Sequence, residues 1–307
     1  LRVEGRTVSC LQRRVRLADT GLPESITSQG NELLLQPLRF VVDDGAAHAF
    51  LAAPDWSVRQ IGSGLVRWQT KGRAGPLRVV CTSTMESDGY INVSLACRAD
   101  RDTSLRDLRL EIPMRPTMAT SLMGIGREGG RRPERYEWRW PAGPANGHYY
   151  DSFWMGDAHG GIHCELRGAD YCGPMVNLYW RLGQLSPPET WANGGKGGCR
   201  VADVEGAATA TSFSGARNLA QGEEVTFEFS LIVTPVKPLD SGRHFRERYY
   251  HSHGPPEQVR AAGGNIVNVH HGSAANPYIN YPFLAAGALR EYVAKMHAAD
   301  LKVKIYY

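Results

Sequence analysis

A strict alternation of apolar and polar residues runs through YINVSLAC, residues 90–97. Ile91, Val93 and Leu95 would share one face of an extended strand, because successive side chains of a strand point to opposite sides. The same period of two recurs in VTFEFSLIV, residues 225–233. This pattern is typical of antiparallel sheets with one buried face, and it predicts a mainly β protein.

Several other segments of residues 1–238 have the same strand-like composition. Further strands are expected at 7–17, 33–42, 65–70, 77–83, 108–112, 161–166 and 207–214. Turn-forming pairs such as Asn146-Gly147 and Gln221-Gly222 separate them, and no convincing helical period appears. So many strands exceed the number in an immunoglobulin domain. We therefore expect a large antiparallel β-sandwich over residues 1–238.

A connector is expected at residues 239–264. Pro235 and Pro238 follow the last strand, and proline removes the donors that a strand ladder needs. Residues 244–251 are expected to form one short helix before Pro255-Pro256.

The C-terminal residues, 265–307, change to a different pattern. A buried strand over residues 265–271 precedes a loop rich in Asn, Pro and Tyr, and a second buried strand covers residues 301–307. Between them, residues 284–300 place apolar side chains at helical spacing. A β-α-β unit opens a parallel α/β domain and cannot cover both faces of its own sheet. We therefore expect residues 265–307 to be the first, incomplete β-α-β unit of a parallel α/β domain, and the chain to be a fragment.

Composition excludes several classes of protein. The chain is 42% hydrophobic and 21% charged, which is typical of a globular protein. Its formal charge is only +4 and it has no basic run of five residues, so we predict no nucleic-acid partner. No apolar run is long enough for a membrane span. The oligomeric state cannot be read from these features.

Metal and cofactor sites are not expected. The six cysteines form no CxxC pair, although Cys164 and Cys172 are close enough in sequence for a bridge. His251 and His253 would lie on one side of an extended strand, as zinc ligands can. However, no carboxylate or cysteine stands at matching spacing nearby, so histidines of a connector or interface are the favoured interpretation.

Several longer runs resemble a known family. They are LIVTPVKPLD at 231–240, HFRERYYH at 244–251, NVHHG at 268–272, NPYINYPF at 276–283 and LKVKIYY at 301–307, with FWMGD at 153–157 and WANGG at 191–195 further upstream. Together they resemble bacterial glycoside hydrolase family 123-like proteins. That resemblance covers most of the chain and implies an N-terminal β-sandwich followed by a (β/α)8 barrel, so residues 265–307 would be the first, incomplete β-α-β unit of a truncated (β/α)8 barrel.

The resemblance also carries expectations about activity. Family 123 is similar to hexosaminidases in which the acetamido group of the substrate is the nucleophile and an adjacent Asp-Glu pair orients it and supplies the acid. In the family that pair lies on a later barrel strand, so the catalytic residues are expected beyond Tyr307. The resemblance thus implies an exported protein (periplasmic, cell-surface or extracellular) that acts on bacterial, plant or host glycans. Residues 1–307 alone are expected to be inactive.

Candidate substrate-binding residues follow from the barrel geometry, because active sites of such barrels form at the C-terminal ends of strands. The candidates come from the end of the first strand and the loop after it: His270, His271, Asn276, Tyr278, Asn280 and Tyr281. Their amide, imidazole and phenol groups suit sugars, which offer hydroxyl edges and apolar ring faces. Tyr306 or Tyr307 can line the same mouth. The alternative is that this loop only packs the top of the barrel.

Two aromatic segments of the sandwich also allow either a binding role or a packing role. Asp151–Asp157, with Trp154, and the glycine-rich loop after Trp191 are either binding loops or core tryptophans beside tight turns, and the second interpretation is favoured.

Two other functions remain as alternatives to a glycosidase. One is a non-catalytic carbohydrate-binding sandwich or scaffold protein, and the other is a metal-dependent hydrolase that uses the histidines.

Overall fold

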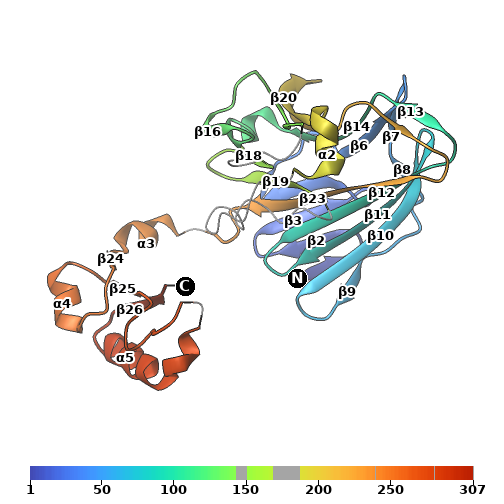
Figure 1. The fold of residues 1–307 in the computed structure, drawn as a ribbon. Helices are drawn as coiled ribbons and strands as arrows, with labels where there is room; N and C mark the ends of the chain where they lie inside the picture. The colour runs from blue at the N-terminus through green and yellow to red at the C-terminus, as the bar shows by residue number, and fades with distance from the viewer. Residues whose placement is uncertain (143–150, 169–186, 239, 280, 307) are drawn as a thin grey trace. The chain divides into compact units, whose positions relative to one another are not determined.

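The computed structural model describes residues 1–142, 151–168, 187–238, 240–279 and 281–306 (Figure 1). The chain divides into two compact units, Leu1–Pro238 and Leu239–Tyr307. The first is built almost entirely of antiparallel strands, and the second contains a parallel sheet with helices. In the described part of the chain, no helix is both long and apolar enough to cross a membrane.

The largest described sheet of the N-terminal unit has ten strands (Figure 1). Its order is β16-β15-β18-β19-β23-β12-β11-β10-β8, and β9 pairs with β10. The bounds are β8 (Leu51–Ala52), β9 (Arg59–Ile61), β10 (Leu65–Ala74), β11 (Leu77–Glu86), β12 (Tyr90–Ala99), β15 (Ser121–Gly124), β16 (Arg127–Arg131), β18 (Ser152–Gly156), β19 (Gly161–Arg167) and β23 (Glu224–Thr234).

A second described sheet has six strands in the order β17-β20-β21-β14-β6-β7. Its members are β6 (Arg39–Asp43), β7 (Ala47–Ala49), β14 (Asp107–Met114), β17 (Arg135–Arg139), β20 (Gly198–Val204) and β21 (Ala207–Phe213). Smaller sheets join β1 (Arg2–Glu4), β2 (Thr7–Cys10), β3 (Arg13–Leu17), β4 (Pro23–Ser28) and β5 (Asn31–Glu32), and β13 (Thr103–Leu105) with β22 (Arg217–Leu219). Short helical turns are η1 (Pro116–Met118), α2 (Glu189–Ala192) and η2 (Asn193–Gly195).

One hydrophobic core holds these sheets together. The inward residues of β12 and β23 are completely buried, among them Ile91, Val93, Phe227 and Phe229. Packing of the two inner faces buries apolar area at roughly 25 cal/mol per Å², which is the main stabilising contribution in a sandwich. The prediction of a mainly β fold with large antiparallel sheets is therefore confirmed.

Two of the predicted strands are wrong in detail. The segment 7–17 is a hairpin, β2 and β3, because Leu11 takes the left-handed conformation (φ 56°) and reverses the chain. Within 33–42 the strand β6 begins only at Arg39, two residues after Pro37. Ahead of it, Leu34 makes an isolated bridge to Met114 instead of a continuous ladder.

The C-terminal unit contains three parallel strands in the order β24-β25-β26 (Figure 1). They are β24 (Tyr249–Tyr250), β25 (Ile266–Val269) and β26 (Lys302–Ile305), with α3 (Ser241–Arg246), α4 (Pro256–Ala261), η3 (Pro282–Ala285) and α5 (Ala286–Ala298) between or before them. The helix predicted at 284–300 corresponds to α5 and the end of η3. Residues 244–251 are not one helix, because the chain leaves α3 after Arg246 and enters β24.

The core of this unit lies between the strands and the helices. Met296 of α5 and Val259 of α4 are fully buried beside Val267 and Val269 of β25. Leu289 and Tyr292 of α5 pack against the same cluster and are partly buried. The amphipathic spacing of α5 thus places its apolar face on the sheet, as the sequence predicts. Because β24 belongs to this sheet, the segment 239–264 contributes a strand to the unit.

Candidate functional site

The carboxyl ends of three neighbouring strands meet at one edge of the parallel sheet. Tyr250 pairs with Val267, and Val269 pairs with Ile305, so the three strands point the same way and end close together. The residues that directly follow them are His251, His270 and Tyr306. In parallel α/β folds, this edge is where ligands bind.

The rings of these residues, together with His271, form a group that we call the ring cluster. The rings of His270 and Tyr306 are stacked, with centroids 4.5 Å apart and planes 13° apart. The ring of His271 lies 4.1 Å from that of His270, and the ring of His251 lies 5.3 Å from it on the other strand. Tyr306 is 40% exposed, so the stack reaches solvent.

Hydrogen bonds fix the tautomers of two of these rings. The side-chain amide nitrogen of Asn268 donates to Nδ1 of His251 (2.8 Å), which leaves the proton of a neutral His251 on Nε2. In contrast, Nδ1 of His270 donates to the carbonyl oxygen of His271 (3.1 Å), which leaves Nε2 of a neutral His270 as an acceptor. The ring cluster therefore combines one donor and one acceptor nitrogen that these contacts do not use.

Asn276 lies beneath this edge. Its side chain is 1% exposed, and its amide nitrogen donates to the carbonyl oxygens of Val269 (3.4 Å) and Tyr306 (3.1 Å). It therefore ties the end of β25 to the end of β26. Its Oδ1 has no partner among the described residues.

The other predicted binding residues lie apart from these contacts. Tyr278 and Tyr281 are exposed, by 63% and 51%, and the ring of Tyr281 packs edge-on against that of Phe283 (5.9 Å). No contact described for either tyrosine joins it to the ring cluster. Asn280 and Tyr307 fall outside the described residues.

Sequence reasoning did not assign His251 to this site. The residue follows a strand of only two residues, which the expected helix at 244–251 concealed. The available signal was Tyr249-Tyr250-His251, in which two residues with high β propensity precede a histidine, as Val269 precedes His270-His271.

The histidines of the ring cluster are not placed as a group of metal ligands. Among the residues that the structure describes, no group of three or more His, Cys, Asp or Glu side chains is placed to hold a metal ion. In the ring cluster, His251 and His270 already use Nδ1 in hydrogen bonds, and the stacked rings meet through their faces.

The two aromatic segments of the sandwich are part of its packing. Trp191 is completely buried, and its indole nitrogen donates to the carbonyl oxygen of Glu228 (2.7 Å). Trp154 is half-buried, and its indole nitrogen donates to Oγ1 of Thr234 (2.9 Å). Both are structural tryptophans beside tight turns, which is the interpretation that the sequence favours. Cys164 is a buried free thiol, and Cys172 lies outside the described residues.

Comparison with solved structures finds distant matches. A galactose mutarotase related enzyme from Lactobacillus acidophilus is 8% identical, with a TM-score of 0.39 over 76% of this chain and 98% of that one. A putative aldose 1-epimerase from Escherichia coli is 11% identical, with a TM-score of 0.38 over 75% and 98%. An α-galactosidase of glycoside hydrolase family 36 from Geobacillus stearothermophilus is 10% identical, with a TM-score of 0.43 over 98% of this chain and 56% of that one.

Family models give a direct assignment. No curated protein matches the chain. The model of the glycoside hydrolase 123 third domain matches residues 1–235, and that of the glycoside hydrolase 123 TIM-barrel domain matches residues 240–307. The two matches meet where the chain divides into its two compact units. The chain therefore belongs to the glycoside hydrolase 123 family, a family of carbohydrate-active proteins.

Proposed function

We propose that this chain is part of a glycoside hydrolase that acts on glycans, and that the ring cluster forms part of its sugar-binding surface. The observation that carries the proposal is the stacked pair His270 and Tyr306 at the carboxyl ends of β25 and β26. Membership of a carbohydrate-active family supports the substrate class. The position at strand ends supports the location, because this is where barrel enzymes bind substrates.

The chemistry of the ring cluster suits a saccharide. An aromatic face packs against the apolar face of a pyranose ring, and Tyr306, which is 40% exposed, would use the face that does not stack on His270. The free Nε2–H of His251 and the free Nε2 of His270 are a donor and an acceptor for hydroxyl groups, which both donate and accept. Asn276 keeps the two strand ends at a fixed distance, so the arrangement exists before a ligand binds.

The ring cluster binds and orients but does not itself supply the acid. Hydrolysis of a glycosidic bond needs a carboxylic acid to protonate the leaving oxygen, and either a second carboxylate or the substrate's acetamido group on the other side. None of the hydrogen bonds and ring contacts described for the ring cluster involves a carboxylate. A purely carbohydrate-binding role is the second candidate, since this set of side chains suffices for binding alone.

Titration of the chain with chito-oligosaccharides and with neutral galacto-oligosaccharides tests the proposal. Affinity is measured by calorimetry for the unchanged chain, for Tyr306→Ala and for the control Tyr249→Ala. Tyr249 is also an exposed tyrosine of this sheet (54%), but it contacts Lys304 instead of the ring cluster. An aromatic stacking contact contributes about 0.5–1.5 kcal/mol, so Tyr306→Ala is expected to weaken binding roughly 2- to 12-fold.

The controls separate the two candidates. Equal affinities of Tyr306→Ala and Tyr249→Ala for every glycan would refute the sugar-binding role of the ring cluster. Because the catalytic residues are expected beyond Tyr307, release of reducing sugar is followed with a longer protein that carries the complete barrel together with residues 1–307. Binding without any release by that protein favours the second candidate.

A further inference from the structure

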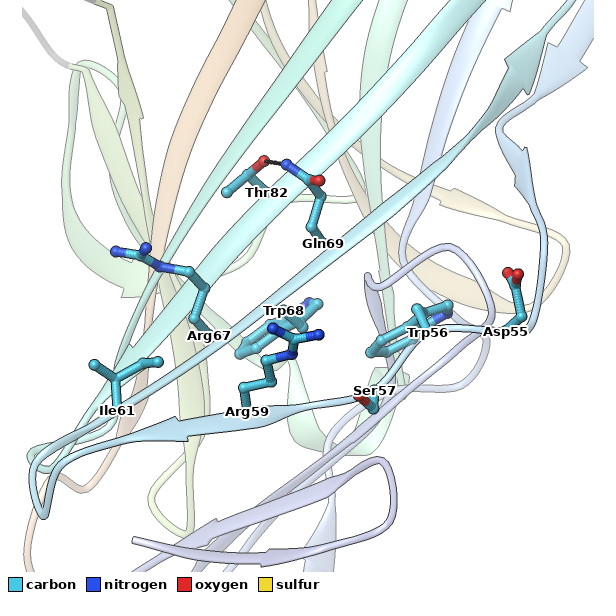
Figure 2. A pocket seen from close by; sticks show the side chains of 9 residues that line it. All are labelled: Asp55, Trp56, Ser57, Arg59, Ile61, Arg67, Trp68, Gln69 and Thr82. Atoms are coloured by element: carbon cyan, nitrogen blue, oxygen red, sulfur yellow. Dashed lines mark hydrogen bonds between the residues drawn. The ribbon is translucent and has the colours of Figure 1, made fainter.

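A cavity of about 570 Å³ lies on the outer surface of the N-terminal unit, between residues 55–61 and the strands β10 and β11 (Figure 2). Its position follows from the alternation along β10. Val66 and Trp68 point into the core, whereas Arg67 and Gln69 point outward. Arg67 and Gln69 therefore lie on the solvent-facing side of β10, whose other side packs in the core.

Two arginines occupy directly opposite positions on the strand pair that borders this cavity. Arg59 of β9 lies directly opposite Arg67 of β10 in the antiparallel register, and both are exposed. Figure 2 shows the two side chains rising from adjacent strands on the pocket side. Like charges in directly opposite positions destabilise a sheet, so this placement is unfavourable in the protein alone.

Within the described residues, no ion pair with a carboxylate offsets this repulsion, because none of the described ion pairs and hydrogen bonds involves Arg59 or Arg67. Asp55 lines the same cavity but forms no ion pair with either arginine, and Figure 2 places it beyond Trp56. Elsewhere on β10 the pattern is different, because Arg73 is paired with Asp100. The two guanidinium groups therefore keep all of their donors for an external anion.

The rest of the cavity adds a rigid ring and hydroxyl-binding groups. Trp56 is fixed by its indole nitrogen, which donates to the carbonyl oxygen of Asp19 (2.7 Å), and by the guanidinium of Arg6, 4.6 Å from its ring centroid. Gln69 donates to Oγ1 of Thr82 on the next strand (3.0 Å), which leaves its amide oxygen as an acceptor. A fixed aromatic ring beside amide and hydroxyl groups is suited to a sugar.

We propose that this cavity is a second carbohydrate site, separate from the ring cluster, and that it binds a saccharide with a carboxylate or sulfate group. The anionic group would lie between Arg59 and Arg67, because guanidinium forks bind such planar or tetrahedral oxyanions through paired hydrogen bonds. The sugar ring would extend toward Trp56, with Gln69 and Asp55 receiving its hydroxyl hydrogens. An anionic group would offset the repulsion between the two facing arginines, so an acidic saccharide should bind more tightly than a neutral one.

Calorimetry with three matched ligands tests this site. They are galacturonate, galactose 6-sulfate and unsubstituted galactose, which differ only at C6, and the stronger of the first two identifies the anionic group. Arg67→Gln is expected to weaken binding of the acidic ligands at least 10-fold and to leave binding of the neutral sugar unchanged. The control is Arg14→Gln, which removes the same charge from an exposed arginine of β3 that lies outside the cavity.

A second measurement uses thermal unfolding, so that a folding defect of Arg67→Gln can be told apart from a loss of binding. In thermal unfolding, inorganic sulfate should raise the midpoint of the unchanged chain and of Arg14→Gln, and raise that of Arg67→Gln much less. Without ligand, Arg67→Gln should unfold no earlier than the unchanged chain, because it removes a repulsive pair. Equal binding of acidic and neutral sugars, or equal affinities of the two variants, would overturn the proposal. Tyr306→Ala should leave this binding unchanged, which separates it from the ring cluster.

Discussion

A close contact between two strands of the large sheet provides a sharp test of the packing. Gly161 begins β19 and pairs with Gly156 of β18 on one side and with Thr234 of β23 on the other. The indole of Trp154 lies across Gly161. A Cβ atom at position 161 would lie 2.6 Å from Cε2 and 2.7 Å from Nε1 of that indole. Gly161→Ala therefore forces the tryptophan to move.

The cost can be worked from these distances. Carbon atoms pack at about 3.5–4.0 Å, so the indole must shift by about 1 Å. Overpacking of this kind costs about 1–3 kcal/mol. The shift also strains the hydrogen bond from Trp154 to Thr234, which contributes about 0.5–1.5 kcal/mol. We expect Gly161→Ala to lower the free energy of unfolding by about 2–3 kcal/mol, and to lower the midpoint temperature by roughly 5–10 °C for a unit of this size.

Urea unfolding followed by tryptophan fluorescence measures this change. All seven tryptophans lie in the N-terminal unit, so the signal reports on that unit alone. The control is Gly130→Ala in β16, where a Cβ meets nothing within 4 Å. There the loss of freedom in the unfolded chain is expected to leave stability unchanged or raise it by up to about 1 kcal/mol.

A double-mutant cycle tests whether the indole of Trp154 causes the loss of stability in Gly161→Ala. In a Trp154→Ala background the added methyl group has space, so Gly161→Ala should then cost less than about 0.5 kcal/mol. If the cost is unchanged without the indole, or if Gly161→Ala behaves like Gly130→Ala, the clash between Gly161 and Trp154 is not the reason for the glycine.

Three further predictions concern the buried core. Trp191→Phe removes the hydrogen bond to a carbonyl of β23 and should lower the free energy of unfolding by about 1–3 kcal/mol in the same urea assay; no change would contradict the structural role of Trp191. Burial raises the pKa of the Cys81 thiol from 9.0 to about 11 and that of Cys199 to about 12. Because the unfolded chain loses these protons first, the contribution of the two thiols to stability should be constant below about pH 9 and should be lost as the pH rises toward 11, as thermal melts at each pH in that range would show. At pH 8 the native chain should resist iodoacetamide at both thiols, with peptide mass spectrometry as the readout, and rapid alkylation would contradict their burial.

The sheets could be predicted where one face of a strand is buried. Along β12, the burial of Ile91, Val93 and Leu95 imposes a period of two on the sequence, and the same constraint acts on β23. The hairpin at Leu11 could not be found in this way. A leucine with positive φ carries no local signal, because glycine and asparagine are the residues that normally mark such turns. Tertiary contacts of β2 and β3 determine that turn.

The site at the parallel strands could be predicted in part for a similar reason. The position of His270 follows from local pattern, because a buried strand precedes it. Its stacking on Tyr306 depends on the register of β25 with β26, and its contact with His251 depends on a strand of two residues. Short strands have too few residues to show a period. Their existence is determined by partners that lie far away in the sequence.

The arginine pair of the second site was accessible to local reasoning, although no strand was expected at 59–61. Gly62-Ser63-Gly64 is a turn signal, and Gly62 takes a positive φ of 71° in the structure. Arg59 and Arg67 are equally far from Ser63 in the sequence. A hairpin centred on Ser63 therefore places them opposite each other, as the register confirms. What the sequence cannot supply is the absence of a neutralising carboxylate among the described contacts. That absence depends on which side chains of β11 and residues 55–57 pack near the two arginines. It is the observation on which the proposal of an anion site rests.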